Sequence, residues 1–243
     1  MRRFLGLLVC MLLLCPGASA SAPEKYVALT FDDGPSGRFT RRLLDGLEAR
    51  QVKATFLLCG YRMKDYPGLT KKIWEAGHEI GLHSYSHSDM GKMSTAEAAR
   101  DIRDTAALLP EGCKPVFLRP PGGSSGDGGT KAAKNAGLAL LNWSVDPRDW
   151  ATRDAEAVQT VVVETVRDGD VILLHDMSDS SVDAALGIID QLQKQGVQFV
   201  TVSELAKIRG ISPKRARAIS EIFCPQMGML LLMGLLSEHK LPL

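Results

Sequence analysis

Short apolar runs rich in β-branched residues alternate with longer stretches of helical periodicity, and this alternation limits the possible folds more than any other feature. Successive β and α units of this kind place the strands parallel, in an open sheet or a closed barrel. We therefore predict an α/β fold, an irregular TIM-like (β/α) barrel of about seven parallel strands, and no internal repeat is visible. The expected strands are Tyr26–Phe31, Ala54–Leu58, Glu79–Leu82, Val116–Leu118, Ala139–Trp143, Val171–Leu174 and Gln198–Val200. The expected helices are Thr40–Arg50, a stretch around Leu69–Ala76, Thr95–Leu109, Thr130–Asn135, Ala155–Val166 and Val182–Lys194.

The N-terminus has the three parts of a secretory signal. Arg2-Arg3 precedes an apolar run, Phe4–Leu14, and the small residues Ala18-Ser19-Ala20 follow. That run is too short to cross the ~30 Å hydrocarbon core of a bilayer as a helix. We predict that residues 1–20 are a cleavable signal peptide, so that the protein is secreted or associated with the cell surface or cell wall.

The rest of the chain divides into a long patterned part and a short tail. Residues 21–210 are predicted to form one folded domain, which would carry any active site, and residues 211–243 form a tail of unassigned role. The formal net charge is +1, and acidic and basic residues are interspersed. This balance gives no indication of nucleic acid or an acidic membrane surface as a partner.

Three cysteines remain after the signal: Cys59, Cys113 and Cys224. An odd number in an exported protein permits one disulfide and one free thiol, and the spacing does not decide the pairing. No C-x-x-C pattern suggests structural zinc, so we interpret these residues as buried small hydrophobes.

The distinctive polar residues follow the expected strands. They are Asp32 and Asp33 after the first, His83 and His87 after the third, Arg119 after the fourth, Asp146 and Asp149 after the fifth, and His175 after the sixth. In (β/α) barrels the active site is built at the C-terminal ends of the strands. We therefore expect these side chains to converge on one site.

A metal site is the first expectation for this face. His83 and His87 are four residues apart, so on one helical turn their imidazoles could reach a common point. Asp32-Asp33 runs into a Gly34-Pro35 turn, where both carboxylates could face one cavity. One carboxylate could then bind the metal and leave the other as a base. Adjacent carboxylates cannot flank a glycosidic bond, which needs a separation of roughly 5–9.5 Å.

The remaining polar residues are candidates for the acid half of the chemistry. His175 follows an apolar strand, and either Asp149 or Asp146 could keep its imidazole charged. Arg119 is placed to pair with a carboxylate, although each such pair alone could equally be structural. We place His78 in no such pair and interpret it as a hydrogen-bonded structural residue.

A glycine-rich stretch, Gly122–Gly129, holds five glycines. It lacks the Gly-Lys-Ser/Thr ending of a phosphate-binding P-loop. We predict a mobile loop between a strand and a helix.

Five segments together resemble, in order, the motifs of the polysaccharide deacetylase family. They are Thr30-Phe31-Asp32-Asp33-Gly34-Pro35, His83-Ser84-Tyr85-Ser86-His87, Arg119-Pro120-Pro121-Gly122-Gly123, Asp146-Pro147-Arg148-Asp149-Trp150 and Leu173-Leu174-His175-Asp176. That family includes chitin, chitooligosaccharide and peptidoglycan deacetylases and some acetylxylan esterases. The similarity extends roughly from Tyr26 to Arg209.

The resemblance implies a role for each motif residue. Asp33, His83 and His87 would bind a divalent ion, usually Zn²⁺, with Co²⁺ or Ni²⁺ as possibilities. Asp32 would be the base, held by Arg119, and His175 would be the acid, paired with Asp149. Trp150 and Leu173 would line the pocket for the acetyl methyl, and the Gly122 N–H would hold the oxyanion. Two positions depart from the usual pattern, since Gly122 stands where an aromatic is common and Leu82 where Asn is frequent. These departures bear on substrate choice more than on chemistry.

The implied function is a metal-dependent hydrolase that removes N-acetyl groups from amino-sugar polymers, such as peptidoglycan or chitooligosaccharide, and releases acetate. The glycan is the expected partner, and no protein partner is inferred. Two alternatives remain open, namely an O-acetyl esterase acting on xylan-like glycans and a non-catalytic surface protein that binds glycans.

Overall fold

The computed structural model describes residues 25–208. All of its paired strands run parallel to their neighbours. They form a seven-stranded sheet in the order β5-β4-β3-β2-β1-β6, and β7 pairs with the first part of β1. The predicted α/β fold with seven parallel strands is confirmed. The strands are β1 (Lys25–Asp32), β2 (Thr55–Leu58), β3 (Glu79–Leu82), β4 (Phe117–Leu118), β5 (Ala139–Leu140), β6 (Val171–His175) and β7 (Val197–Phe199).

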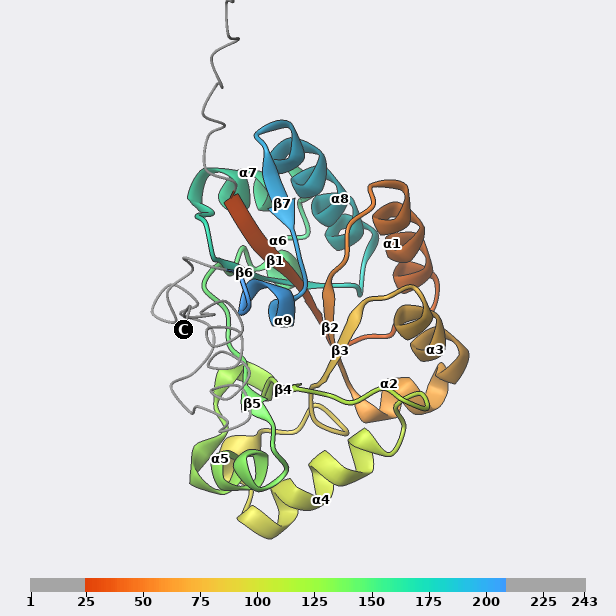
Figure 1. The fold of residues 1–243 in the computed structure, drawn as a ribbon, viewed down its shortest axis with the longest axis vertical. Coiled ribbons are helices and arrows are strands. Elements are labelled where there is room, and N and C mark those ends of the chain that lie inside the picture. The colour runs from red at the N-terminus through yellow and green to blue at the C-terminus, as the bar shows by residue number, and fades with distance from the viewer. Residues whose placement is uncertain (1–24, 209–243) are drawn as a thin grey trace, which may run out of the picture.

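The longer helices lie around the outside of these strands, whereas the short helix Val202–Leu205 packs against the interior (Figure 1). Six of them correspond to the expected helices, with ends shifted by a few residues, whereas the short helices α2, α6 and α9 were not predicted. The helices are α1 (Arg38–Ala49), α2 (Gly60–Asp65), α3 (Pro67–Glu75), α4 (Thr95–Ala106), α5 (Gly126–Asn135), α6 (Asp149–Thr152), α7 (Ala155–Thr165), α8 (Asp179–Lys194) and α9 (Val202–Leu205).

The segment after β5 connects the two ends of the sheet. At one end the Leu141 N–H donates to the Leu118 carbonyl at 3.0 Å. A few residues later Val145 forms a parallel bridge to Ile172 of β6, and the Leu173 N–H donates to the Val145 carbonyl at 2.9 Å. Residues 139–145 therefore complete an irregular barrel, as the sequence predicts.

Alternation along β1 separates two hydrophobic cores. Val27, Leu29 and Phe31 point outward and pack with α1 and α8, because successive side chains of a strand face opposite ways. Ala28 points inward and belongs to a second, smaller cluster inside the barrel. The members of that cluster are Ala28, Leu57, Phe117, Ala139, Leu141 and Val171, together with Val202 and Leu205 of α9. Thr30 and Asp32 continue the inward face toward the C-terminal end of β1, where the interior becomes polar.

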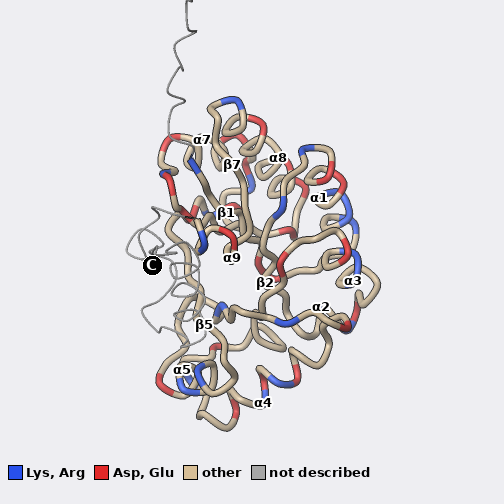
Figure 2. Tube along the Cα trace, viewed as in Figure 1, with Lys and Arg blue, Asp and Glu red and all other residues tan. Residues whose placement is uncertain are grey.

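Charged residues of both signs are spread over the outer helices (Figure 2). Ion pairs join α1 to α8, with Arg38 beside Asp179 at 2.8 Å and Arg50 beside Asp190 at 2.7 Å. The Arg38–Asp179 pair is exposed and contributes at most about 1 kcal/mol to stability, whereas the Arg50–Asp190 pair is partly buried.

The prediction of a mobile loop at Gly122–Gly129 is wrong for its second half, because α5 begins at Gly126. The glycines let this helix approach another segment's backbone. A Cβ on Gly126 would lie 2.7 Å from the Gly91 carbonyl oxygen, and one on Gly128 would lie 2.2 Å from that of Met93. Close packing, which needs residues without side chains, explains the glycines better than mobility does.

Several predictions concern residues outside the described range. The signal peptide at residues 1–20, the tail at residues 211–243 and Cys224 all lie there, and the boundaries of the domain stay predictions. Cys59 is a buried free thiol and Cys113 a partly buried one, consistent with their interpretation as small hydrophobes. Within residues 25–208, no helix has the length and apolar character needed to cross a membrane.

Candidate active site

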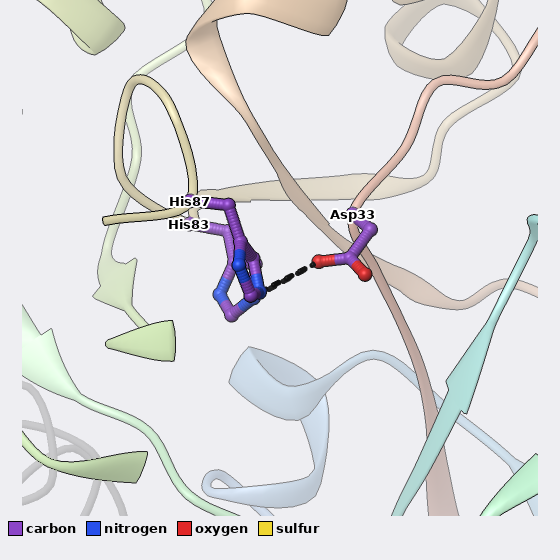
Figure 3. A group of neighbouring side chains, drawn as sticks. All are labelled: Asp33, His83 and His87. Carbon is purple, nitrogen blue, oxygen red and sulfur yellow. Dashed lines mark ion pairs between the residues drawn. The ribbon is translucent and has the colours of Figure 1, made fainter. Parts of the chain in front are cut away.

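Three side chains converge at the C-terminal end of the strands. Asp33 Oδ1 lies 3.3 Å from His83 Nε2 and 3.2 Å from His87 Nε2. One ligand atom from each residue lies within 4.8 Å of the others. The centroids of the two imidazoles are 5.1 Å apart, and Figure 3 shows both rings on the side that faces the Asp33 carboxylate.

The backbone at Asp33 explains how two adjacent carboxylates share one cavity. Asp32 ends β1 facing the barrel interior, so a regular strand would turn Asp33 to the opposite face. Asp33 instead adopts a positive φ of 70°, which breaks the alternation. Its carboxylate therefore reaches the same end of the barrel as that of Asp32.

The two histidines lie on an irregular loop after β3, and the expectation of a shared helical turn is wrong. Ser84 and His87 both have positive φ, 63° and 56°, which a right-handed helix excludes. These turns bring both imidazoles to one point although the segment is not helical. The spacing of four residues is thus satisfied by a tight loop.

A hydrogen bond selects the tautomer of His83. Its Nδ1 lies 2.7 Å from the backbone carbonyl oxygen of Arg119, which can only accept, so Nδ1 carries the proton. The lone pair on Nε2 then faces Asp33 and is available to a metal. Metal-binding histidines commonly donate their other N–H to a carbonyl in this way.

The electrostatics of the cluster fit a divalent cation. Asp33 Oδ1 is buried and has no hydrogen-bond partner within the described range, so its charge is not satisfied by neighbouring donors. Burial raises the pKa of Asp33, but the neighbouring imidazoles of His83, His87 and His175 outweigh this effect and lower that pKa. One carboxylate and two imidazoles match the ligands of catalytic zinc sites, which leave a position open.

Asp32 and Arg119 form a buried pair beside this cluster. Arg119 Nη1 donates to Asp32 Oδ1 at 2.6 Å and to the Thr30 hydroxyl at 2.8 Å. The other carboxylate oxygen, Asp32 Oδ2, lies 3.7 Å from His83 Nε2. The guanidinium therefore fixes one oxygen and leaves the second facing the cluster.

His175 and Asp149 form a second pair, with His175 Nε2 4.0 Å from Asp33 Oδ2. The ring Nδ1 of His175 donates to Asp149 Oδ1 at 2.8 Å, and the backbone N–H of His175 donates to Asp149 Oδ2 at 2.9 Å. Burial lowers the pKa of His175, but Asp149, Asp32 and Asp33 together raise it to about 9. Asp146, the other carboxylate that the sequence offered, is exposed and accepts from the Arg148 N–H.

The three residues expected to bind substrate differ in exposure. Leu173 is buried in β6, whereas Trp150 is 54% exposed, with the Arg148 guanidinium 5.4 Å from its ring centroid. Gly122 has a φ of 67°, and a Cβ built on it would meet nothing within 4 Å. The backbone at Gly122 is therefore open to a ligand.

His78 lies apart from the site, as expected of a structural residue. Its Nδ1 accepts from the Ala54 N–H at 3.2 Å, and burial lowers its pKa to about 4. The imidazole is therefore neutral and holds the chain between α3 and β3.

Two residues near the site have supporting contacts that sequence reasoning missed. Asp101 of α4 accepts hydrogen bonds from Ser84 and Tyr85 in the histidine loop. Asp176 is fully buried, its side chain accepts from the Thr40 hydroxyl, and its backbone carbonyl accepts from the Ser36 hydroxyl. Asp176 is the last residue of the fifth motif, which was the only signal pointing to it, whereas no pattern marks Asp101 among the charged residues of α4.

A (β/α) barrel with a His-His-Asp cluster between an Asp–Arg pair and a His–Asp pair has the parts of a metal-assisted hydrolase. The family model described as polysaccharide deacetylase matches residues 19–141. A peptidoglycan-N-acetylglucosamine deacetylase from Bacillus cereus is 40% identical over 192 residues, covering 76% of this chain and 90% of its own length. The chain belongs to the polysaccharide deacetylase family.

Two further comparisons show the breadth of that similarity. The peptidoglycan-N-acetylmuramic acid deacetylase PdaC from Bacillus subtilis is 38% identical over 188 residues, which make up 76% of this chain but 40% of PdaC. The chain thus spans about two fifths of that relative. A family 4 acetyl xylan esterase from Clostridium thermocellum, solved with a cobalt ion, matches with a TM-score of 0.72 at 35% identity, covering 82% of this chain and all of its own. The predicted family and enzyme class are confirmed.

Proposed function

We propose that this protein hydrolyses N-acetyl groups of amino-sugar polymers, with peptidoglycan as the first substrate to test and chitooligosaccharide as the second. The observation that carries the proposal is Asp32, a buried carboxylate held by Arg119 with its free oxygen 3.7 Å from a candidate ligand. Relatives that share this part of the chain are named as deacetylases of peptidoglycan.

Asp33, His83 and His87 would hold the metal, which we propose is Zn²⁺, with Co²⁺ or Ni²⁺ able to replace it. When bound, a divalent cation polarises the acetamide carbonyl and lowers the pKa of the attacking water. The low pKa of Asp33 and the Nε2 lone pair of His83 favour binding near neutral pH, because metal ligands must be deprotonated.

Asp32 would act as the base. Its free oxygen would take a proton from the attacking water, while Arg119 binds the other oxygen and fixes the direction of the carboxylate. His175 would act as the acid and give its Nε2 proton to the departing amine, because Asp149 occupies Nδ1. The products would be acetate and a glucosamine unit.

The remaining assignments concern the acetyl group. The open backbone of Gly122 would donate its N–H to the oxyanion, an interaction whose removal costs about 3–4 kcal/mol of barrier in other acyl-transfer sites. Leu173 and the exposed Trp150 would contact the methyl and the sugar. The proposed signal peptide would export the protein to the cell surface or beyond, where such glycans lie.

The direct test is acetate release from peptidoglycan, chitooligosaccharide and acetylxylan, each measured after chelation and again after adding zinc. We expect release from the N-acetyl substrates that stops with chelation and returns with zinc. The Asp32→Asn variant should still bind zinc but lose about 10²–10⁴-fold in kcat. Full activity of that variant, or activity after complete metal removal, would contradict the proposal.

A second candidate is an O-acetyl esterase that uses the same site. The similarity to the acetyl xylan esterase favours it, and the open space at Gly122 is compatible with a differently shaped glycan. Faster release from acetylxylan than from either N-acetyl substrate would establish this function instead. No acetate from any of the three substrates, with glycan binding retained, would point to a non-catalytic protein.

A further inference from the structure

The loop that carries both candidate histidine ligands is held in place by a carboxylate on a distant helix. Asp101 lies on α4, and its Oδ2 accepts from the Ser84 hydroxyl at 2.9 Å. The Tyr85 N–H also points at this carboxylate, 3.0 Å from Oδ2 and 3.1 Å from Oδ1. Asp101 thus binds the two residues that directly follow His83.

The same contact closes the loop toward His87. The Ser84 hydroxyl donates to Asp101 and at the same time accepts from the Ser88 N–H at 3.2 Å. Ser84 and Ser88 lie on either side of the segment that ends in His87. Asp101 therefore fixes the direction of the hydroxyl that joins the two ends of the loop.

This loop needs such support because its backbone is unfavourable. Ser84 and His87 have positive φ, 63° and 56°, a region of backbone conformation that is unfavourable for residues with a side chain. On the other side of the loop, the Gly60 N–H donates to the Ser84 carbonyl at 3.1 Å and the Tyr61 N–H to the Tyr85 carbonyl at 2.8 Å. Helices α2 and α4 together hold the loop from both sides.

We propose that Asp101 is a positioning residue that sets the affinity of the metal site, acting through Ser84 and Tyr85 on His83 and His87. The inference rests on the proposed function, since it assumes that these histidines bind a metal. Asp101 itself is no candidate ligand, and it is not placed in the catalytic machinery. Its effect should therefore appear in metal binding before it appears in the chemical step.

The test compares Asp101→Ala with Asp104→Ala. Asp104 is one turn further along α4 and exposed, with Arg103 3.8 Å away, so this control makes the same change in charge and helix propensity. Zinc dissociation constants are measured by competition with a chromophoric chelator, and melting temperatures are measured on the metal-free proteins. We expect Asp101→Ala to weaken zinc binding by about 10–100-fold, as for other residues that orient metal ligands. Asp104→Ala should stay within about twofold of the parent protein.

Two further measurements separate positioning from other effects. Asp101→Asn keeps one acceptor oxygen, so it should lose less affinity than Asp101→Ala, and it replaces that variant if alanine prevents folding. At saturating zinc, kcat of the Asp101 variants should return to near the parent value. If Asp101→Ala, or Asp101→Asn in its place, binds zinc as tightly as the Asp104→Ala control does, the inference is overturned and the proposed function stays intact. A parent protein that binds no zinc would instead remove the proposed function and this inference together.

Discussion

Arg119 Nη1 lies 2.6 Å from Asp32 Oδ1, and both side chains are almost completely excluded from solvent. The same guanidinium donates to the Thr30 hydroxyl and to the carbonyls of Leu141 and Asn142. One cation therefore satisfies a carboxylate and three neutral oxygens inside the barrel. Removing one partner of a buried pair is far more costly than removing an exposed pair.

We expect Arg119→Met to destabilise the protein by about 3–5 kcal/mol, because it leaves the Asp32 charge buried without a counter-ion. Urea unfolding monitored by circular dichroism measures the change. Arg38→Met is the control, since the pair with Asp179 is exposed and should contribute less than about 1 kcal/mol. Equal unfolding free energies for the two variants would show that the buried pair does not stabilise the fold.

The His175–Asp149 pair predicts a change in pH dependence. Asp149 helps raise the pKa of His175 to about 9, so Asp149→Asn should lower that pKa. If protonated His175 is the acid, activity falls as pH rises through its pKa, and the alkaline limb of the kcat profile should move to lower pH in the variant. A cation beside Asp33 opposes protonation, so the midpoint in the metal-loaded enzyme should lie below 9.

The matched control for this profile is Asp146→Asn, which removes the exposed carboxylate of the same motif. We expect its alkaline limb to coincide with that of the parent enzyme. An Asp149→Asn profile that only falls in height, with an unmoved alkaline limb, would argue against His175 as the acid.

Two glycine-to-alanine substitutions should have opposite effects on stability. In Gly128→Ala the new Cβ would meet the Met93 carbonyl oxygen at 2.2 Å, so we expect a loss of about 1–3 kcal/mol. Gly68 is also helical, but a Cβ there would meet nothing within 4 Å. Gly68→Ala should therefore be neutral or stabilising by up to about 1 kcal/mol. Thermal unfolding of both variants measures the contrast, and a stabilised Gly128→Ala would refute the packing explanation of α5.

Asp176 predicts a pH-dependent stability. Burial raises its pKa to about 6, while the Thr40 hydroxyl opposes the shift. The native pKa lies above the unfolded one, so the protonated side chain contributes stability at low pH that is lost as pH rises through about 6. Asp176→Asn does not titrate, so its stability relative to the parent should rise by about 3 kcal/mol between pH 4 and pH 8. Unfolding curves at several pH values test this, and a constant difference would contradict it.

The sequence predicted the fold because strand and helix patterns depend on short-range periodicity. β3 was placed at Glu79–Leu82 as observed, and the seven parallel strands follow from the alternation itself. The glycines of α5 misled the prediction, because close packing against Met93 and mobility use the same residue type. A barrel was predicted, but the contact that closes it was not, because the bridge from Val145 to Ile172 joins residues distant in sequence and periodicity does not encode such contacts.

The candidate site was predictable in its members but less so in its geometry. Polar residues after successive strands had to meet at one end of a barrel, and the structure brings Asp32, Asp33, His83 and His175 together there. The positive φ at Ser84 and His87 was not foreseen, because the spacing of the histidines also suits a helical turn. Asp101 was missed for a related reason, since its role arises only from the packing of α4 against that loop.

Arg119 touches both halves of the candidate chemistry, its side chain on Asp32 and its backbone carbonyl on His83 Nδ1. A displacement of this one residue would therefore move Asp32 and His83 in the same direction. The distance between Asp32 and His83 should therefore stay nearly constant, even where thermal motion or a bulky bound glycan shifts both side chains within the molecule. The end of β4 supports both side chains, which would let one reaction geometry serve polymers of different shape.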